Sequence, residues 1–257
     1  MSSRDDIFSV HGRVVVITGA TKGLGRAFAT GLAAAGARVV VSSRKQDGCE
    51  TVAAEIESDG GDALALAAHV GAWDTLPQFV DRVVAHYGRI DALVNNAGIS
   101  PAFCAIADMT EAYWDKVMST NVKGPLRLSA LVAPHMRDAG GGSIVNVASV
   151  AGYRGQERNS HYSASKAALL NLTQSMAAEW APWGIRVNSI SPGPFRTTMM
   201  DGLERTTPDG LRQLAATTLQ HRVADPAEAV GLARFLLSDA SVFVTGADHE
   251  ISGGRRG

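Results

Sequence analysis

Short apolar runs alternate with longer stretches of mixed polarity along almost the whole chain. Continuous apolar runs of strand length are typical of strands buried on both faces of a parallel sheet, whereas apolar residues at helical spacing indicate amphipathic helices. We predict strands at residues 13–18, 38–42, 63–67, 91–95, 143–148 and 185–190, and a final strand pair at 242–245 and 249–251. Helices are expected at residues 26–35, 47–58, 73–87 and 225–237, in the run that contains Lys166, and over 110–136 with an interruption near Lys123-Gly-Pro125.

This alternation is interrupted by no linker and no internal repeat, so we treat residues 1–257 as one domain. Regular exchange of strand and helix favours the α/β class, as a doubly wound parallel sheet with helices on both faces and right-handed crossovers. The expected architecture is a single Rossmann-type domain. The polar, glycine-containing segment 198–222 is predicted to form a variable lid over the crevice.

The first predicted strand passes directly into the glycine-rich run Gly19-Ala-Thr-Lys-Gly-Leu-Gly25, and a helix follows. Glycines in this position allow the backbone to approach a pyrophosphate, and the helix N-terminus offers free N–H groups. The same run could serve only as a tight turn between strand and helix. As a binding loop, it would contribute Gly19, Thr21, Lys22, Gly23, Leu24 and Gly25.

The second strand ends in Ser43-Arg44-Lys45, where the ribose of an adenine dinucleotide would lie. An acidic residue there would select NAD, whereas an arginine accommodates a 2′-phosphate. Ser43 and Arg44, together with Lys22, therefore favour NADP(H), with NAD(H) still possible. Alternatively, Arg44 and Lys45 simply begin a solvated helix.

Ser149 follows a predicted strand, and Tyr162 and Lys166 stand four residues apart near a helix start. That spacing places two side chains on one helix face. A tyrosine hydroxyl titrates near ~10, and a neighbouring ammonium lowers that pKa. The trio therefore suits proton transfer at a carbonyl or alcohol oxygen, for which a separate cofactor must carry hydride. A Tyr-x-x-x-Lys pair is also common on ordinary helix surfaces.

Composition excludes several function classes. The net charge of −1 argues against nucleic-acid or membrane binding driven by bulk charge. Two cysteines are too few for a disulfide framework, and no metal site is expected. The polar N-terminus shows no secretory signal, and no apolar run has the length of a membrane span. A cytoplasmic protein with a small-molecule substrate is the default expectation.

Five separated motifs occur in a fixed order, and together they resemble the short-chain dehydrogenase/reductase family from about residue 12 to 254. They are the glycine run with Thr18 before it, Asn95-Asn-Ala-Gly98, Asn121, Ser149 with Tyr162-Ser-Ala-Ser-Lys166, and Pro192-Gly193. Each motif alone is weakly specific, and the ordered set is highly specific.

The resemblance implies an oxidoreductase in which Tyr162 is the acid or base and Ser149 orients the substrate oxygen. Lys166 would lower the pKa of the tyrosine and bind the nicotinamide ribose, and Asn121 would hold a water that leads to Lys166. Asn121 lies within the predicted helix 110–136, where asparagine is unfavourable, so it could also be a hydrogen-bonding core residue. Further cofactor contacts are implied at Val70, Asn96, Ala97, Gly98, Pro192, Gly193, Phe195 and Thr197. Relatives usually form homotetramers or homodimers.

Two positions depart from the family pattern. Relatives commonly carry an acidic residue at the end of the third strand, where this chain has His69, which leaves the backbone of Val70 to meet the adenine. Near the C-terminus, Ile251-Ser-Gly-Gly254 stands where relatives often read Val-Asp-Gly-Gly. The second difference is expected to alter a local or interface contact and not the chemistry.

The substrate remains open at this stage. Arg154, Arg158, His161 and Arg196 are expected in loops at the mouth, where they could hold a sugar acid or polyol, or could simply be solvated. A small carbonyl compound is equally compatible. A 3-oxoacyl reductase acting on a carrier protein or CoA thioester is an alternative, but Asp138 and Trp183 stand where carrier-protein reductases tend to be basic. A non-catalytic cofactor-binding sensor is a further alternative.

Overall fold

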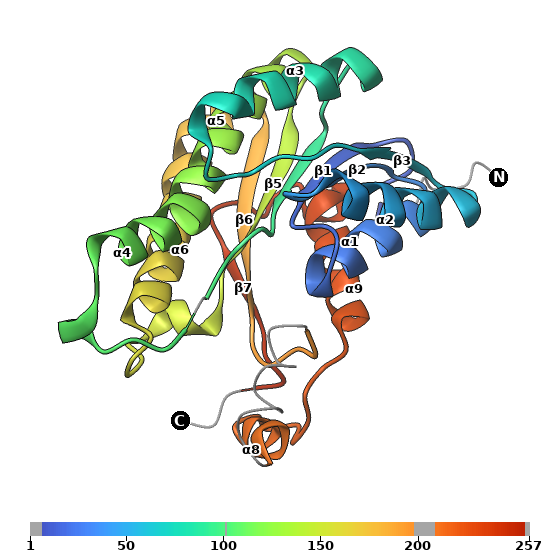
Figure 1. Cartoon of the computed structure of the whole chain (residues 1–257). Coiled ribbons are helices and arrows are strands. Elements are labelled where there is room, and N and C mark those ends of the chain that lie inside the picture. Colours follow the sequence, from blue (N-terminus) through green and yellow to red (C-terminus); the bar gives the residue numbers. More distant parts are fainter. Residues whose placement is uncertain (1–6, 101, 198–208, 255–257) are drawn as a thin grey trace.

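Parallel strands form one continuous sheet at the centre of the molecule (Figure 1). The computed structural model describes residues 7–100, 102–197 and 209–254. Within these residues the sheet has seven strands in the order β3-β2-β1-β4-β5-β6-β7. The strands are β1 Val14–Thr18, β2 Arg38–Ser42, β3 Asp62–Ala65, β4 Ala92–Asn95, β5 Gly142–Val147, β6 Ile185–Pro192 and β7 Asp248–Ile251.

Helices cover both faces of the sheet: α1, α2 and α9 lie on one face, and α3, α5 and α6 on the other (Figure 1). The α-helices are α1 Gly23–Ala34, α2 Gln46–Ser58, α3 Leu76–Tyr87, α4 Glu111–Met118, α5 Gly124–Asp138, α6 Ser160–Trp180, α8 Gly210–Ala216 and α9 Val230–Leu237. Shorter turns are η1 Trp73–Thr75, η2 Ile106–Asp108, the π-turn η3 Ser119–Lys123, η4 Val150–Tyr153, η5 Ala181–Trp183, η6 Pro226–Ala229 and η7 Asp239–Ser241.

Successive side chains along each strand point to opposite faces of the sheet and pack into two separate hydrophobic cores. Val15 and Ile17 of β1 pack with α1, α2 and α9, whereas Val14 and Val16 pack with α3, α5 and α6. A strand with both faces buried must be apolar at every position, which explains the continuous apolar run in the sequence. The predicted doubly wound α/β fold is confirmed.

The structure corrects one element prediction and refines two others. Residues 242–245 form a turn and not a strand, because Asp248–Ile251 takes the place beside β6 and leaves Phe243 fully exposed. The helical segment 110–136 is interrupted as predicted, although the π-turn η3 places the interruption at Ser119–Lys123, just before the predicted position. Of the predicted lid, residues 198–208 lie outside the described part of the chain, and the remainder contains α8.

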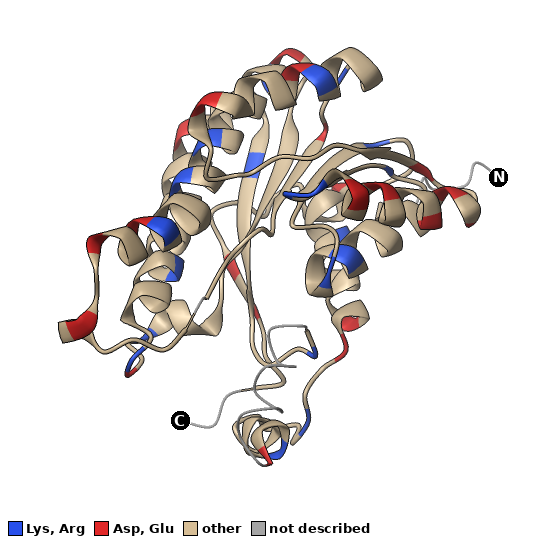
Figure 2. Cartoon of the chain, in the orientation of Figure 1, with Lys and Arg blue, Asp and Glu red and all other residues tan. Residues whose placement is uncertain are grey.

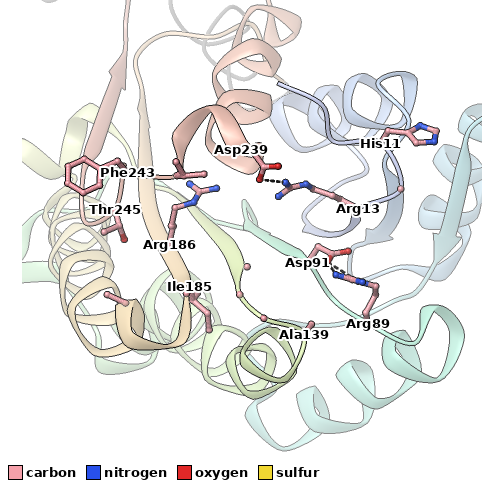
Figure 3. A pocket seen from close by; sticks show the side chains of 17 residues that line it. His11, Arg13, Arg89, Asp91, Ala139, Ile185, Arg186, Asp239, Phe243 and Thr245 are labelled. Atoms are coloured by element: carbon pink, nitrogen blue, oxygen red, sulfur yellow. Dashed lines mark hydrogen bonds and ion pairs between the residues drawn. The ribbon is translucent and has the colours of Figure 1, made fainter. Parts of the chain in front are cut away.

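A cavity of about 780 Å³ opens at the amino ends of the strands (Figure 3). Arg13 pairs with Asp239 there, and Arg89 Nε donates to Asp91 Oδ1 at 2.8 Å. Ligands of open α/β sheets bind outside the carboxyl ends of the strands, so this cavity lies at the wrong edge for the predicted site.

Acidic and basic residues are interspersed along the helices that cover the sheet (Figure 2). This mixture agrees with the net charge of −1. No helix within the described residues has the length and apolar character needed to cross a membrane.

Candidate active site

Three polar side chains meet at the carboxyl end of β5. Tyr162 and Lys166 lie one turn apart on α6, and the Lys166 ammonium stands 5.6 Å from the centre of the tyrosine ring. Lys166 is buried and donates a hydrogen bond to the carbonyl of Val147 at 2.7 Å. Ser149 caps the turn η4, and its side chain interacts with that of Tyr162. The structure therefore brings the predicted trio together.

Burial controls the titration of this cluster. It lowers the pKa of Lys166 to about 8, because the ammonium is withdrawn from water. Burial also raises the pKa of Tyr162, and the hydrogen bond with Ser149 acts in the opposite direction. The sequence predicts a lowered tyrosine pKa, but here desolvation outweighs the hydrogen bond with Ser149. The Tyr162 hydroxyl is therefore protonated at neutral pH.

Asn121 lies on the π-turn η3 and is fully buried. Its Nδ2 donates to the carbonyl of Ile99 at 2.9 Å and to Ser165 Oγ at 3.0 Å, while its Oδ1 accepts from the N–H of Ile99 at 2.8 Å. A Cβ added to Gly98 would lie 3.4 Å from Lys166 Nζ and 3.5 Å from Asn121 Oδ1. Asn121 thus ties the segment after β4 to α6, directly beside Lys166. π-turns of this kind are frequent at functional sites.

The glycine loop is closed by a brace from β4. Asn96 Nδ2 donates to the carbonyls of Thr18 and Gly19, at 2.9 and 3.2 Å. Gly19 has φ +65°, and a Cβ on Gly25 would lie only 2.2 Å from the Gly19 carbonyl oxygen. These positions therefore need glycine to let the loop fold back on itself. Ala97 completes the brace, because its N–H donates to Thr18 Oγ1 at 3.0 Å.

Helix α1 presents a bare N-terminus above this loop. Its N-cap, Lys22, makes no side-chain cap, and no acidic residue lies in the first turn. The first N–H groups of a helix have no partner within the helix, and the dipole adds positive potential. Together with the glycine loop, this fits the pyrophosphate of a dinucleotide.

The end of β2 supplies basic groups next to the loop. Thr21 Oγ1 donates to Ser43 Oγ at 3.2 Å, which joins the glycine loop to the β2 end. Lys22, Arg44 and Lys45 are exposed, and none of them forms an ion pair with another described residue. Cations without a carboxylate partner are available to an anionic group such as a ribose phosphate.

The remaining predicted contacts occupy different settings. Thr197 meets the loop, since a Cβ on Gly23 would lie 3.1 Å from its methyl group. Gly193 N donates to the carbonyl of Ile251 at 2.9 Å, which holds Pro192 at the end of β6. The Phe195 side chain is buried in the core, so only its backbone can face a ligand. Val70 is buried, with its carbonyl against Gly124.

The two histidines singled out in the sequence, His161 and His69, occupy different environments. His161 does not lie in a mouth loop: it belongs to α6, is fully buried against the ring of Tyr113, and has neither ring nitrogen hydrogen-bonded within the described residues. Burial lowers its pKa. His69 is exposed, and its Nδ1 accepts from the N–H of Gly71 at 3.1 Å.

Sequence reasoning missed two groups that shape the site. The Val147 carbonyl holds Lys166, and Thr18 Oγ1 accepts the N–H groups of Asn96 and Ala97. Only the position of Thr18 at a strand end could have indicated its role. A backbone carbonyl leaves no mark in the sequence.

Comparisons with known proteins agree with this geometry. A family model described as short chain dehydrogenase matches residues 13–208. Human dehydrogenase/reductase SDR family member 4 is 36% identical over 256 residues, which covers 99% of this chain and 90% of the human protein.

Solved structures share the fold at similar identity. A short-chain type dehydrogenase/reductase from Mycobacterium marinum superposes with a TM-score of 0.91 at 37% identity, covering 96% of this chain and 97% of that one. A protein from Beutenbergia cavernae, provisionally named NAD(P)-dependent gluconate 5-dehydrogenase and holding NADP at low occupancy, gives 0.90 at 36% identity, with 96% and 98% covered. The chain belongs to the short-chain dehydrogenase/reductase family of NAD(P)-dependent oxidoreductases that act on CH–OH groups.

Proposed function

We propose that this chain is an NADP(H)-dependent oxidoreductase that interconverts a ketone and a secondary alcohol, with Asn121, Ser149, Tyr162 and Lys166 as its catalytic residues. One observation carries the proposal: the Lys166 ammonium is buried 5.6 Å from the centre of the Tyr162 ring, and the side chain of Ser149 interacts with the same tyrosine. A glycine cradle and a bare helix N-terminus lie at the same edge of the sheet. The bound nicotinamide would supply or accept the hydride.

The side chains divide the remaining work. In reduction, the Tyr162 hydroxyl donates its proton to the substrate oxygen, and in oxidation the phenolate takes it back. The Ser149 hydroxyl donates a hydrogen bond to the same oxygen and stabilises developing negative charge. Because burial raises the pKa of Tyr162, the hydroxyl is protonated at neutral pH and ready for reduction.

Lys166 and Asn121 support the tyrosine. The ammonium of Lys166 is held by Val147 and offsets the charge left on the phenolate after proton donation. Asn121 fixes the segment beside Lys166, and a water held by Asn121 is the proposed route by which the proton is replaced.

The choice of NADP(H) rests on the β2 end. Arg44, Lys45 and Lys22 are exposed without a carboxylate partner among the described residues, and no acidic residue stands there to hold the ribose hydroxyls. Arg44 is the residue best placed by the sequence to meet a 2′-phosphate. Gly19, Thr21, Gly23, Leu24, Gly25, Ser43, Val70, Asn96, Ala97, Gly98, Pro192, Gly193, Phe195 and Thr197 would complete the cofactor site.

For the substrate, two chemistries have support. Arg154, Arg158 and Arg196 are exposed, which suits a sugar acid, and the Beutenbergia cavernae relative carries a gluconate dehydrogenase name. Phe103 and Ile106 are exposed on the segment after β4, at 68% and 76%, which suits an apolar carbonyl compound. A 3-oxoacyl thioester is the alternative substrate, and the substrates tested must include one.

The test is steady-state oxidation of NADPH and NADH with keto acids, keto sugars, apolar ketones and a 3-oxoacyl-CoA. We expect NADPH to be preferred. Replacing Arg44 by Ala should raise the KM for NADPH by ~10-fold or more and leave that for NADH unchanged, since a charge-assisted hydrogen bond contributes ~1.5–3 kcal/mol. Arg82→Ala, an exposed arginine on α3, is the matched control. Preference for NADH would overturn the NADP(H) assignment.

We also propose that residues 1–257 form one domain and that the protein assembles as a homotetramer or homodimer. Light scattering coupled to size exclusion measures the assembly. A single cooperative unfolding transition is expected of the domain.

A further inference from the structure

A single carboxylate gathers three hydroxyl groups at the edge of the sheet. Asp248, the first residue of β7, accepts hydrogen bonds from Ser189 Oγ at 2.6 Å and from Ser191 Oγ at 2.9 Å. The hydroxyl of Tyr153 donates a third, to the other carboxylate oxygen. No ion pair joins Asp248 to another described residue, so these hydroxyls stabilise its charge.

Tyr153 ends the short turn that begins at Ser149. The turn η4 runs from Val150 to Tyr153, and Ser149 is its N-cap. The Ser149 hydroxyl oxygen accepts from the N–H of Ala151 at 3.1 Å. The direction of the Ser149 side chain is therefore set by the path of this turn, and Tyr153 anchors the other end of it.

The middle of the turn is packed against the helix that carries the other catalytic groups. A Cβ on Gly152 would lie 3.0 Å from the carbonyl carbon of Lys166 and 3.1 Å from the nitrogen of Ala167. The turn is thus clamped between α6 on one side and the β6–β7 edge on the other. The hydrogen bond from Tyr153 to Asp248 holds the turn on the side of β7.

The Tyr153 hydroxyl is a stable donor. Burial raises its pKa to about 12, and the hydrogen bond to Asp248 adds to the effect. It therefore stays protonated across the range in which an enzyme of this kind works. Ser191 precedes Pro192, so the same carboxylate also holds the strand end that leads into the proposed nicotinamide segment.

We propose that Tyr153 and Asp248 are positioning residues for the reaction: together they hold the turn η4 so that the Ser149 hydroxyl faces Tyr162. The inference rests on the proposed function of Ser149. It adds a pair that lies outside the catalytic set and outside the cofactor cradle.

The chain provides a matched control for this pair. Tyr87 on α3 donates to Asp62 Oδ1 on β3 at 2.8 Å, a tyrosine–carboxylate hydrogen bond at the opposite edge of the sheet. Tyr153→Phe and Tyr87→Phe each remove one hydroxyl and retain the ring. We expect Tyr153→Phe to lower kcat by ~10- to 100-fold, the order expected when a reacting group is misplaced. Tyr87→Phe should leave kcat unchanged, and the Kd for NADPH should change in neither variant.

A double variant distinguishes a positioning role of Tyr153 from a general loss of structure. In Ser149→Ala enzyme the misplaced hydroxyl is already absent, so adding Tyr153→Phe should cause no further loss of kcat. Asp248→Asn should repeat this pattern if Tyr153→Phe folds poorly. In a crystal structure of Tyr153→Phe, Ser149 Oγ should lie beyond hydrogen-bond distance from the Tyr162 hydroxyl.

Each other outcome overturns the inference. If Tyr153→Phe retains kcat as Tyr87→Phe does, or if its loss of kcat multiplies with that of Ser149→Ala, the hydrogen bond between Tyr153 and Asp248 is only structural. Full activity in Ser149→Ala alone would refute the proposed function as well, which distinguishes the two failures.

Discussion

Lys166 is a site residue whose burial destabilises the folded protein. Burial lowers its pKa to about 8 from 10.5, so the unfolded chain binds this proton more tightly than the folded one. Between these two values the unfolded state carries more protons, and stability rises with pH. Below pH ~8 the full penalty is present, at ~1.4 kcal/mol for each unit of lowering.

Replacing Lys166 by Met should therefore abolish turnover and stabilise the protein. The hydrogen bond to Val147 is lost, at ~1 kcal/mol, but the larger burial penalty disappears. We expect unfolding at pH 7 to require ~2–3 kcal/mol more in the variant, and the gain to shrink as pH rises above 8. Denaturant titration at several pH values measures this.

The control for that prediction is Lys116→Met, at an exposed lysine on α4, which should alter stability by less than ~0.5 kcal/mol at any pH. A less stable Lys166→Met protein at pH 7 would show that the hydrogen bond to Val147 outweighs the burial penalty.

Single residues also show what sequence can reveal about the site. The spacing of Tyr162 and Lys166 on one helix face, and the position of Ser149 after a strand, follow from the pattern of the chain. The raised pKa of Tyr162 and the burial of His161 do not, because both depend on which side chains exclude water in three dimensions.

Among the elements, the glycine loop and α1 form the most constrained junction. Gly25→Ala would place a Cβ 2.2 Å from the Gly19 carbonyl oxygen and 2.3 Å from Asn96 Nδ2, so the loop and its brace must shift. We expect a loss of ~1–3 kcal/mol of stability and weaker binding of NADPH, measured by denaturant titration and fluorescence titration.

Gly231→Ala is the matched comparison, because an added Cβ on that residue of α9 meets nothing within 4 Å. It should stabilise the protein by ~0.5–1 kcal/mol through helix propensity and leave NADPH binding unchanged. Normal stability and binding in Gly25→Ala would show that the loop tolerates a side chain, contrary to this account.

Helices and strands could be predicted from the sequence where a local pattern of apolar residues alone determines the element. Buried parallel strands read as apolar runs, and β1, β2 and β6 begin within one residue of their predicted starts. Residues 242–245 have strand composition but form a turn, because β7 occupies the edge of β6 and Asn188 Nδ2 holds the Val244 carbonyl at 2.8 Å. The π-turn at Asn121 likewise follows from its bonds to Ile99 and Ser165, which no local pattern encodes.

At the scale of the whole molecule, the carboxyl ends and the amino ends of the strands have different roles. The carboxyl edge brings together residues far apart in the sequence, from the loop at Gly19 to Lys166. The amino ends of the strands border the cavity, where Arg13 pairs with Asp239 and Arg89 pairs with Asp91 (Figure 3). Strand alternation predicts the fold class, but the order of the strands depends on long-range pairing that periodicity does not encode.

The most direct test of the account compares wild-type enzyme with Tyr162→Phe. The measurement is ketone-dependent oxidation of NADPH, followed by the absorbance of the reduced nicotinamide, alongside the Kd for NADPH. We predict that the variant binds NADPH normally and loses turnover by at least ~100-fold, as expected when a general acid is removed. Undiminished turnover in Tyr162→Phe would contradict the assignment of Tyr162 as the proton donor.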